Sequence, residues 1–196
     1  MFHLQKVQIL VHVSATKYKF KREKMDTRPY VVVMGVTGCG KTELGRQLAQ
    51  TLNLAFIEGD RFHPDSNIQK MKTGMALTDE DRAGWLQAII DASLSGSQGV
   101  VIACSALKQR YRDVFRQQLF NLTFLYLEID ESTALHWVTS RPDHFYPSSL
   151  VNSQFEVFEV PSQEQDVLAL DATEPVVSLI ARAKAWLRGA TSAVLA

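Results

Sequence analysis

Gly35-Val36-Thr37-Gly38-Cys39-Gly40-Lys41-Thr42 is the stretch of sequence that decides the fold of this 196-residue chain. It matches the pattern G-x-x-x-x-G-K-[ST] and directly follows an apolar, β-branched run at residues 30–34. Glycines in such a loop let the backbone turn tightly, so that several N–H groups point inward, and the helix that begins near Lys41 adds the positive end of its dipole. Residues 35–42 are therefore predicted to bind the phosphates of a nucleotide.

Two side chains of the loop have separate expected roles. Lys41 can reach the β- and γ-phosphates as a positive charge, and the hydroxyl of Thr42 can fill one coordination position of Mg²⁺. Leu44, Leu48 and Leu52 follow at helical spacing, so the loop has a strand before it and a helix after it. That context argues against the alternative, a glycine-rich turn that binds nothing.

Length and composition fit one enzyme-sized domain. A chain of 196 residues that is 46% hydrophobic can bury one sizeable core but divides poorly into two domains. No run of about 18 apolar residues occurs, so we expect no membrane partner. The two cysteines make no disulfide framework, which suits a reducing, cytoplasmic compartment.

The net charge of zero conceals a basic segment at the start of the chain. Residues 1–24 contain six Lys or Arg and one Glu, a net charge of +5, which leaves −5 on the remainder. We expect the functional domain to occupy residues 25–196, with residues 1–24 as an upstream or disordered extension. The alternative is an organelle-targeting segment, which the single Arg and the scarcity of Ser make the weaker interpretation. Nucleic-acid binding would depend on this segment alone, so we expect none.

Strand-like and helix-like patterns alternate along the rest of the chain. Short apolar runs without period-two alternation, as in strands buried on both faces, occur at residues 30–34, 55–57, 100–104, 124–127 and 167–170. Three amphipathic helices are also predicted from apolar residues at helical spacing. The apolar face of the first consists of Trp85, Leu86, Ile89, Ile90 and Leu94, and that of the second consists of Leu107, Tyr111, Val114 and Phe115. The apolar face of the third consists of Val176, Val177, Ile180, Ala183 and Leu187. The first of them follows a capping-box pattern at Thr78 and Asp81. This order predicts an α/β fold of three layers, a parallel sheet between helices, with ligands at the carboxyl ends of the strands.

The second predicted strand ends at Glu58-Gly59-Asp60-Arg61-Phe62-His63-Pro64. In a parallel sheet whose first strand leads into a phosphate loop, this edge faces the γ-phosphate. Asp60 is therefore the best candidate to orient or deprotonate an acceptor hydroxyl, and it can also hold Mg²⁺ through water. A turn or cap is the alternative role for Asp60, and packing before Pro64 is the alternative to a ligand contact for His63.

Three cations follow the third predicted strand at helical spacing. Lys108, Arg112 and Arg116 recur every four residues, which places them along one side of a helix, opposite its apolar face. A solvated basic face is the usual explanation of such a stripe. Lys108, however, is expected in the first turn, where the helix dipole disfavours a cation, so an anionic ligand explains it better.

A proline-rich loop at residues 141–147 is expected between the fourth strand and the next helix. It carries Arg141 and His144, and an arginine on a loop near a phosphate site suggests a lid that closes over nucleotide and acceptor. Closure excludes water, which would otherwise compete as the phosphoryl acceptor.

Several motifs together resemble gluconokinases of the small, shikimate-kinase-like type. They are the phosphate loop, Gly59-Asp60-x-x-His63-Pro64-x-x-Asn67-x-x-Lys70-Met71-x-x-Gly74, Leu77-x-Asp79-x-Asp81-Arg82-x-x-Trp85-Leu86, Cys104-Ser105-Ala106-Leu107-Lys108-x-x-Tyr111-Arg112-Asp113, Arg141-x-x-His144-Phe145 and Ser153-Gln154-Phe155. The resemblance covers about residues 30 to 171 in order. It implies a nucleoside monophosphate kinase-like P-loop fold and transfer of the ATP γ-phosphate to D-gluconate, giving 6-phospho-D-gluconate and ADP.

The resemblance also implies roles for particular residues. Lys41 and Arg141 would neutralise charge on the transferring phosphoryl group, and Asp60 would act on the reacting hydroxyl. Arg112 or Lys108 would hold the carboxylate of gluconate, with His63 and His144 as further substrate contacts. ATP and Mg²⁺ are the implied cofactors, and a homodimer is the implied assembly.

Three positions depart from the family pattern. Ala76 stands where a proline is usual, Ile129 where a glycine is common, and Trp137 where an arginine commonly sits four residues before Arg141. Related kinases use that arginine against the adenine ring. Trp137 either replaces it by stacking or belongs to the hydrophobic core.

Three other classes of protein compete with this interpretation. A GTP-binding switch should contain N-K-x-D, yet no Asn in this chain precedes a Lys, and the D-x-x-G match at residues 81–84 follows no apolar strand. A kinase of shikimate or of another small sugar acid would share most of these motifs. A non-catalytic nucleotide-binding protein is disfavoured because Lys41, Thr42 and Asp60 are all present.

Overall fold

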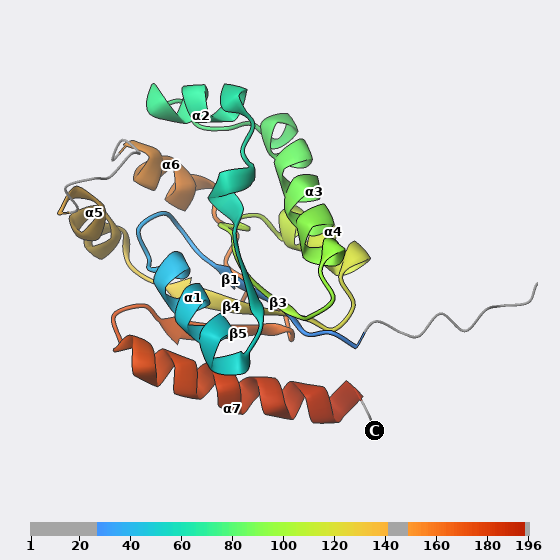
Figure 1. Ribbon diagram of the computed structural model, residues 1–196. Coiled ribbons are helices and arrows are strands. Elements are labelled where there is room, and N and C mark those ends of the chain that lie inside the picture. Colours follow the sequence, from blue (N-terminus) through green and yellow to red (C-terminus); the bar gives the residue numbers. More distant parts are fainter. Residues whose placement is uncertain (1–26, 141–148, 195–196) are drawn as a thin grey trace, which may run out of the picture.

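The protein folds around a five-stranded parallel sheet with strand order β2-β3-β1-β4-β5 (Figure 1). The computed structural model describes residues 27–140 and 149–194. Its strands are β1 (Tyr30–Met34), β2 (Ala55–Glu58), β3 (Val100–Ala103), β4 (Leu122–Glu128) and β5 (Val167–Asp171). Every pair of neighbouring strands is parallel. The predicted fold class is confirmed, and the five predicted strands differ from the observed ones by only a residue or two at their ends.

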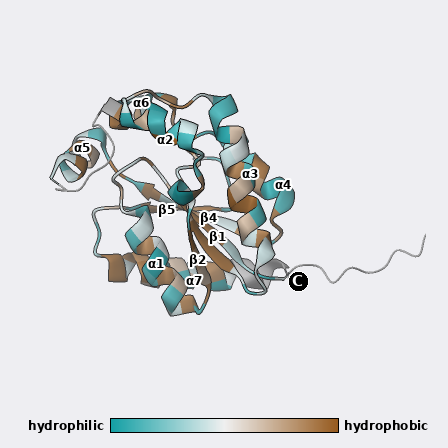
Figure 2. Cartoon of the chain, turned by 45° about the horizontal axis from the view of Figure 1, so that its top comes forward, coloured by the Kyte–Doolittle hydropathy of each residue, from teal (hydrophilic) through white to brown (hydrophobic). Residues whose placement is uncertain are grey.

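Helices cover both faces of this sheet. They are α1 (Lys41–Leu52), the 3₁₀ helix η1 (Gly59–Phe62), α2 (Asp65–Lys72), α3 (Asp79–Ser95), α4 (Gln109–Gln118), α5 (Glu131–Thr139), α6 (Ser149–Val157) and α7 (Val176–Val194). Alternate residues of β1 enter two separate cores: Val31 and Val33 pack with α1 and α7, and Tyr30 and Val32 pack with α3 and α4. The central strands are accordingly hydrophobic along their length (Figure 2). A strand buried on both faces has a continuous apolar sequence, which is why a short apolar run without period-two alternation located it.

Local signals set the start of α3 and its apolar face. The hydroxyl of Thr78 accepts a hydrogen bond from the N–H of Asp81, and the carboxylate of Asp81 accepts one from the N–H of Thr78, so the predicted capping box is confirmed. Trp85, Ile89 and their neighbours are buried as expected. Leu94 is 39% exposed, because it lies in the last turn, past the edge of the sheet.

Loops and helix ends gather at the carboxyl edge of the sheet. The N–H of Gly35 donates to the carbonyl of Ser105 over 3.3 Å, which joins the phosphate loop to the segment after β3. Gly59 brings η1 close to the same strand: a Cβ on it would lie 2.5 Å from the carbonyl oxygen of Ala103, so no larger residue fits. Above this edge stand α2, the start of α3 and α6 (Figure 1). Within the described residues, no helix has the length and hydrophobicity needed to cross a membrane.

Candidate active site

The phosphate loop lies between β1 and α1, as its sequence predicts. Gly38 has φ 85°, and a Cβ at this position would come within 2.5 Å of a Val138 methyl group, so the loop requires glycine there. Lys41 begins α1, and its Nζ donates to the carbonyl of Val36 over 2.8 Å. The ammonium group is thereby folded back over the loop, at the centre of the backbone donors that would surround a phosphate.

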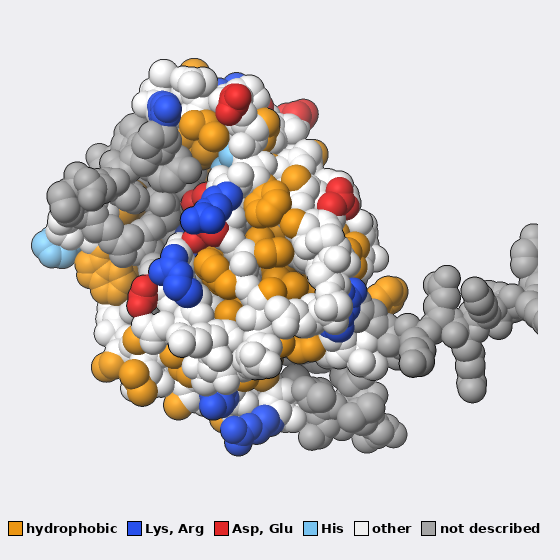
Figure 3. Space-filling view, in the orientation of Figure 1, with side chains coloured by type: hydrophobic (Ala, Val, Ile, Leu, Met, Phe, Trp, Pro, Cys, Tyr) orange, Lys and Arg blue, Asp and Glu red, His pale blue; other side chains and the backbone are white. Residues whose placement is uncertain are grey.

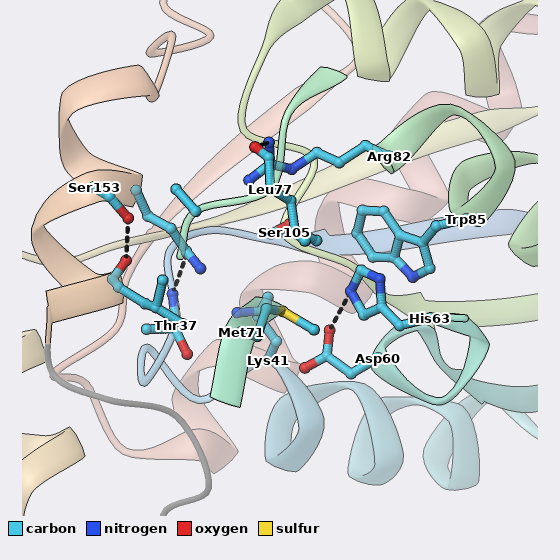
Figure 4. Close-up of a pocket in the computed structure, with 13 residues that line it drawn as sticks. Thr37, Lys41, Asp60, His63, Met71, Leu77, Arg82, Trp85, Ser105 and Ser153 are labelled. Carbon is cyan, nitrogen blue, oxygen red and sulfur yellow. Dashed lines mark hydrogen bonds and ion pairs between the residues drawn. The ribbon is translucent and has the colours of Figure 1, made fainter. Parts of the chain in front are cut away.

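A pocket opens beside the loop with a volume of about 570 Å³, counting the part open to solvent. Its walls come from the phosphate loop, η1, α2, α3, α6 and the segment after β3 (Figure 4). They are formed by Thr37, Lys41, Asp60, His63, Met71, Ala76, Leu77, Arg82, Trp85, Ser105, Leu150, Ser153 and Gln154. Acidic and basic side chains lie next to one another over η1 and the start of α1 in Figure 3. The structure thus brings Lys41 together with Asp60 and His63 in one pocket, as expected from the strand ends.

Asp60 and His63 form the acceptor wall of this pocket. The side chain of Asp60 is 49% exposed, and its Oδ1 lies 4.0 Å from Nε2 of His63. The ring of His63 stacks on Trp85 at 4.2 Å between centroids and 14° between planes (Figure 4). Trp85 is itself held by a 2.7 Å hydrogen bond from its Nε1 to the carbonyl of Gly59. His63 therefore both packs and faces the pocket, so the two roles considered for it are compatible.

Burial keeps His63 neutral. Loss of solvent lowers its pKa to about 4, an effect that the nearby Asp60 carboxylate opposes and the Arg82 guanidinium reinforces. At neutral pH the imidazole is therefore an uncharged group beside the carboxylate of Asp60.

Arg82 is a pocket residue that one of the quoted motifs contains but to which the sequence assigned no role. It lines the pocket from the first turns of α3, and its guanidinium donates to the carbonyl of Leu77. No carboxylate among the described residues forms an ion pair with it. The sequence could have predicted that Arg82 lies close to Trp85, because it precedes Trp85 by three residues and therefore lies on the same face of the helix.

Arg112, in contrast, does not line the pocket. Its side chain is 1% exposed, and Nε, Nη1 and Nη2 donate to Glu164, to the Ala106 carbonyl and to the Glu159 carbonyl at 2.9–3.0 Å. Burial alone would raise the pKa of Glu164, but hydrogen bonds from Arg112 and Arg116 outweigh it and hold that pKa below its usual value. The expected role of Arg112 in holding a substrate carboxylate is thus corrected: Arg112, with Arg116, ties α4 to the segment before β5.

Lys108 lies at the rim of the pocket. It is the N-cap residue of α4 rather than a member of its first turn, and its Nζ lies 3.0 Å from Oδ1 of Asp79. Asp79 also accepts hydrogen bonds from Tyr111 and Arg110. Those from Tyr111 and Lys108 lower the pKa of Asp79 to about 2. A recess that continues from the main pocket is lined by both Arg82 and Lys108, so these two cations face one space.

Gln154 connects α6 to the phosphate loop. Its Oε1 accepts a 2.7 Å hydrogen bond from the backbone N–H of Thr37, and both residues line the pocket (Figure 4). Sequence reasoning gave Gln154 no role, because a contact between residues 117 positions apart leaves no local pattern.

Several expected site residues lie outside the part of the chain that the structure describes. These are Arg141 and His144, together with the extension at residues 1–24. The structure places α5 between β4 and the expected lid, a helix that the sequence had not indicated. Trp137, in α5, is half-buried and packs against the core beneath α1 and α7, so it contributes to the core.

The residues available to a metal ion are few. Within residues 27–140 and 149–194, no group of three or more His, Cys, Asp or Glu side chains could hold a metal ion. Thr42 lies in the first turn of α1, where the phosphate-loop pattern requires a hydroxyl, and Asp60 is the one carboxylate among the described residues that line the pocket. One hydroxyl and one carboxylate suit Mg²⁺, which is commonly shared between such side chains and nucleotide phosphates.

Comparison with known proteins matches this geometry. The shikimate kinase family model matches residues 37–173. The thermosensitive gluconokinase of Escherichia coli K12 is 41% identical over 152 residues, which are 76% of this chain and 81% of the relative. The chain belongs to the gluconokinase family.

Solved structures agree with the assignment to the gluconokinase family. A gluconokinase from Sinorhizobium meliloti 1021 superimposes with a TM-score of 0.77 at 39% identity, covering 85% of this chain and 95% of that one. A shikimate kinase from Bacteroides thetaiotaomicron gives a TM-score of 0.59 at 16% identity, with 82% and 98% coverage, and shares the fold. The D-x-x-G match at residues 81–84 lies within α3, so it is a helical segment and not the loop of a GTP-dependent switch.

Proposed function

We propose that this protein transfers the γ-phosphate of ATP to the 6-hydroxyl of D-gluconate, giving 6-phospho-D-gluconate and ADP. The observation that supports it best is the pocket, in which Lys41 of the phosphate loop, Asp60 and the uncharged His63 share one space with the cation Arg82. A small polyol with a single carboxylate needs such a combination of acceptor, donor and positive charge. Family membership makes gluconate the first substrate to test.

The proposed chemistry assigns one role to each charged residue. Asp60 accepts the proton of the attacking hydroxyl, and Lys41 stabilises charge on the phosphates, with Arg141 of the expected lid as a further proposed cation. Mg²⁺, held by Thr42 and through water by Asp60, would neutralise phosphate charge. Catalysis of this kind consists of positioning and electrostatic stabilisation, without a covalent intermediate on the protein.

The carboxylate of the substrate is proposed to bind between Arg82 and Lys108. Both cations line the recess that continues from the pocket, whereas the donors of Arg112 are already satisfied by Glu164 and backbone carbonyls. Arg82 is the stronger candidate, because Lys108 is paired with Asp79, whereas no described carboxylate forms an ion pair with Arg82. His144 of the lid remains a proposed further contact with the sugar hydroxyls.

An assay of ADP release tests the reaction. ATP and Mg²⁺ are supplied with gluconate, with other sugar acids, with shikimate, and without an acceptor. We expect release that depends on gluconate and the appearance of a sugar phosphate. Preference for shikimate or another acid would replace the substrate, and equal release without acceptor would indicate an ATPase and contradict the kinase assignment.

Two proposals concern the chain outside the pocket. We propose that a chain beginning at Met25 keeps full activity, with residues 1–24 external to the domain, and that the enzyme is a cytoplasmic homodimer. Light scattering on the full-length and the shortened chain measures the assembly, and microscopy of fluorescent fusions measures the location. Loss of activity on truncation, a monomer, or organellar fluorescence that requires residues 1–24 would contradict the corresponding proposal.

A further inference from the structure

The hydrogen bonds around Asn67 determine which nitrogen of His63 carries the proton. Asn67 lies on α2 and is 2% exposed. Its Nδ2 is 2.8 Å from the carbonyl oxygen of Asp81 and 3.3 Å from Nδ1 of His63. A carbonyl oxygen can only accept, so the group that faces Asp81 must be the NH₂ of the amide. The same NH₂ has a second hydrogen, and that hydrogen faces Nδ1 of His63.

Nδ1 of His63 therefore accepts a hydrogen bond through its lone pair. A neutral imidazole carries one proton, so it resides on the other nitrogen, Nε2. Nε2 is the ring atom that lies 4.0 Å from Oδ1 of Asp60. Stacking on Trp85 holds the ring in this orientation, so that the Nε2–H group is on the side of the ring that faces Asp60.

The charged form of His63 is disfavoured by the same contact. An imidazolium would place an N–H at Nδ1 against the NH₂ of Asn67, so that two donors would face each other. Of the charged groups around the ring, Asp60 of η1 favours the imidazolium and Arg82 of α3 opposes it. Burial of the ring already favours the neutral form, so the contact with Asn67 acts in the same direction and, in addition, selects which nitrogen carries the proton.

We propose that Asn67 is a positioning residue that holds His63 as the Nε2–H tautomer, so that His63 donates a hydrogen bond at the acceptor wall and Asp60 alone accepts the proton. This inference rests on the proposed function and assigns separate roles within the same site. An acceptor hydroxyl presents its oxygen lone pair to Nε2–H and its proton to Asp60. The site therefore recognises a hydroxyl, which offers both, and His63 takes no part as a base.

Nitrogen-15 NMR of the full-length protein tests the assignment directly. The chain is labelled with ¹⁵N-histidine, and the His63 ring is identified by the loss of its signals in His63→Gln. At neutral pH we expect the chemical shift of Nε2 to be that of a protonated nitrogen and the shift of Nδ1 to be that of a bare one. A proton on Nδ1, or on both nitrogens, overturns the proposal.

Variants separate this role from simple support of α2. In Asn67→Ala the donor to Nδ1 is lost, so we expect averaged ring shifts and a 10- to 100-fold fall in kcat/KM for gluconate, with KM for ATP within about twofold of wild type. Lys70→Ala is the matched control, because Lys70 also ties α2 to Asp81, at 2.7 Å, but has no contact with His63. The control should keep the Nε2–H signature and kcat/KM within a few-fold.

Each outcome bears on one proposal. Equal loss of activity in both variants with unchanged ring shifts would overturn the positioning role. If the wild-type protein phosphorylates no gluconate, the proposed function fails, whereas the tautomer is read from the spectrum independently of any activity.

Discussion

The two ends of the pocket are built from different parts of the chain. At the phosphate end the donors are backbone N–H groups of residues 35–42, held by glycine conformations such as that of Gly38. At the acceptor end the functional groups are side chains on three separate elements: Asp60 on η1, Asn67 on α2 and Arg82 on α3. A backbone-built site depends on local conformation, whereas a side-chain-built site depends on how helices pack.

This difference affects how the specificity for the acceptor substrate can change during evolution. The phosphate end can accept any nucleoside triphosphate with little change, because every phosphate offers the same oxygens. The acceptor end can change its substrate by exchanging a few side chains without altering the sheet.

The largest effect is expected for Asp60→Asn. The amide keeps the shape of the carboxylate but cannot accept the proton of the hydroxyl, so kcat should fall by about 10²- to 10⁴-fold. Steady-state kinetics with gluconate measure it, and circular dichroism checks the fold. Arg61→Gln, a neighbouring exposed position on η1, is the control and should retain near-normal turnover. A rate within threefold of wild type in Asp60→Asn would remove this residue from the mechanism.

Lys41→Ala tests the phosphate end. Loss of the one side-chain charge among the backbone donors should reduce kcat by about 10²- to 10³-fold, while the loop keeps its glycine-determined shape. Isothermal titration with a non-hydrolysable ATP analogue should still detect binding. Arg46→Ala removes an exposed cation of the same helix and should have no effect. Complete loss of nucleotide binding in Lys41→Ala would mean that the backbone contributes less than we infer.

Arg82→Gln should raise KM for gluconate by about 10- to 100-fold with little change in KM for ATP, since a charge-assisted hydrogen bond to the substrate carboxylate is lost. Arg112→Met is the informative comparison. It should leave KM for gluconate unchanged but lower the free energy of unfolding by about 3–5 kcal/mol, because buried Glu164 keeps only Arg116 as a partner and the carbonyls of Ala106 and Glu159 lose their donor. The reverse pattern, with KM changed only in Arg112→Met, would restore Arg112 to the substrate site.

The smallest expected effect is a loss of local stability in acid at the start of α3, which belongs to the acceptor end of the pocket. The pKa of Asp79 is about 2, below its ordinary value of 3.8, so its contacts stabilise the fold above pH 3.8 and this contribution is lost as the pH falls towards 2. The pKa of Asp81 is lowered by Lys70 and by the cap at Thr78, so it acts in the same direction. Amide exchange, corrected for intrinsic rates, should show the start of α3 losing protection at pH 3 before α1 does. Asp79→Asn should reduce this difference, and equal loss in both helices would contradict it.

Sequence alone located the strands and the phosphate loop because both are local. Residues 35–42 carry their own conformational requirements, and a strand buried on both faces reads as an apolar run wherever it occurs. The grouping of Asp60 and His63 near the phosphate loop could also be predicted from the sequence, because both residues follow the end of a strand and parallel strands end at one edge of the sheet.

Only the tertiary structure distinguished the two arginines. Arg82 and Arg112 both lie on helices next to the pocket. Successive residues of a helix are rotated by about 100° around its axis, so a small error in the predicted orientation of the helix changes whether a side chain faces solvent or the core. The partners of Arg112, Glu159 and Glu164, are about fifty positions away in the sequence.

The sequence by itself determined the phosphate loop between Gly35 and Thr42, because backbone geometry is encoded by adjacent residues. Tertiary structure decided which cation lines the pocket and which nitrogen of His63 faces Asn67, and the proposed carboxylate site and tautomer rest on these. Those properties depend on contacts such as Asn67 to Asp81 and Gln154 to Thr37, which form only when distant segments pack together.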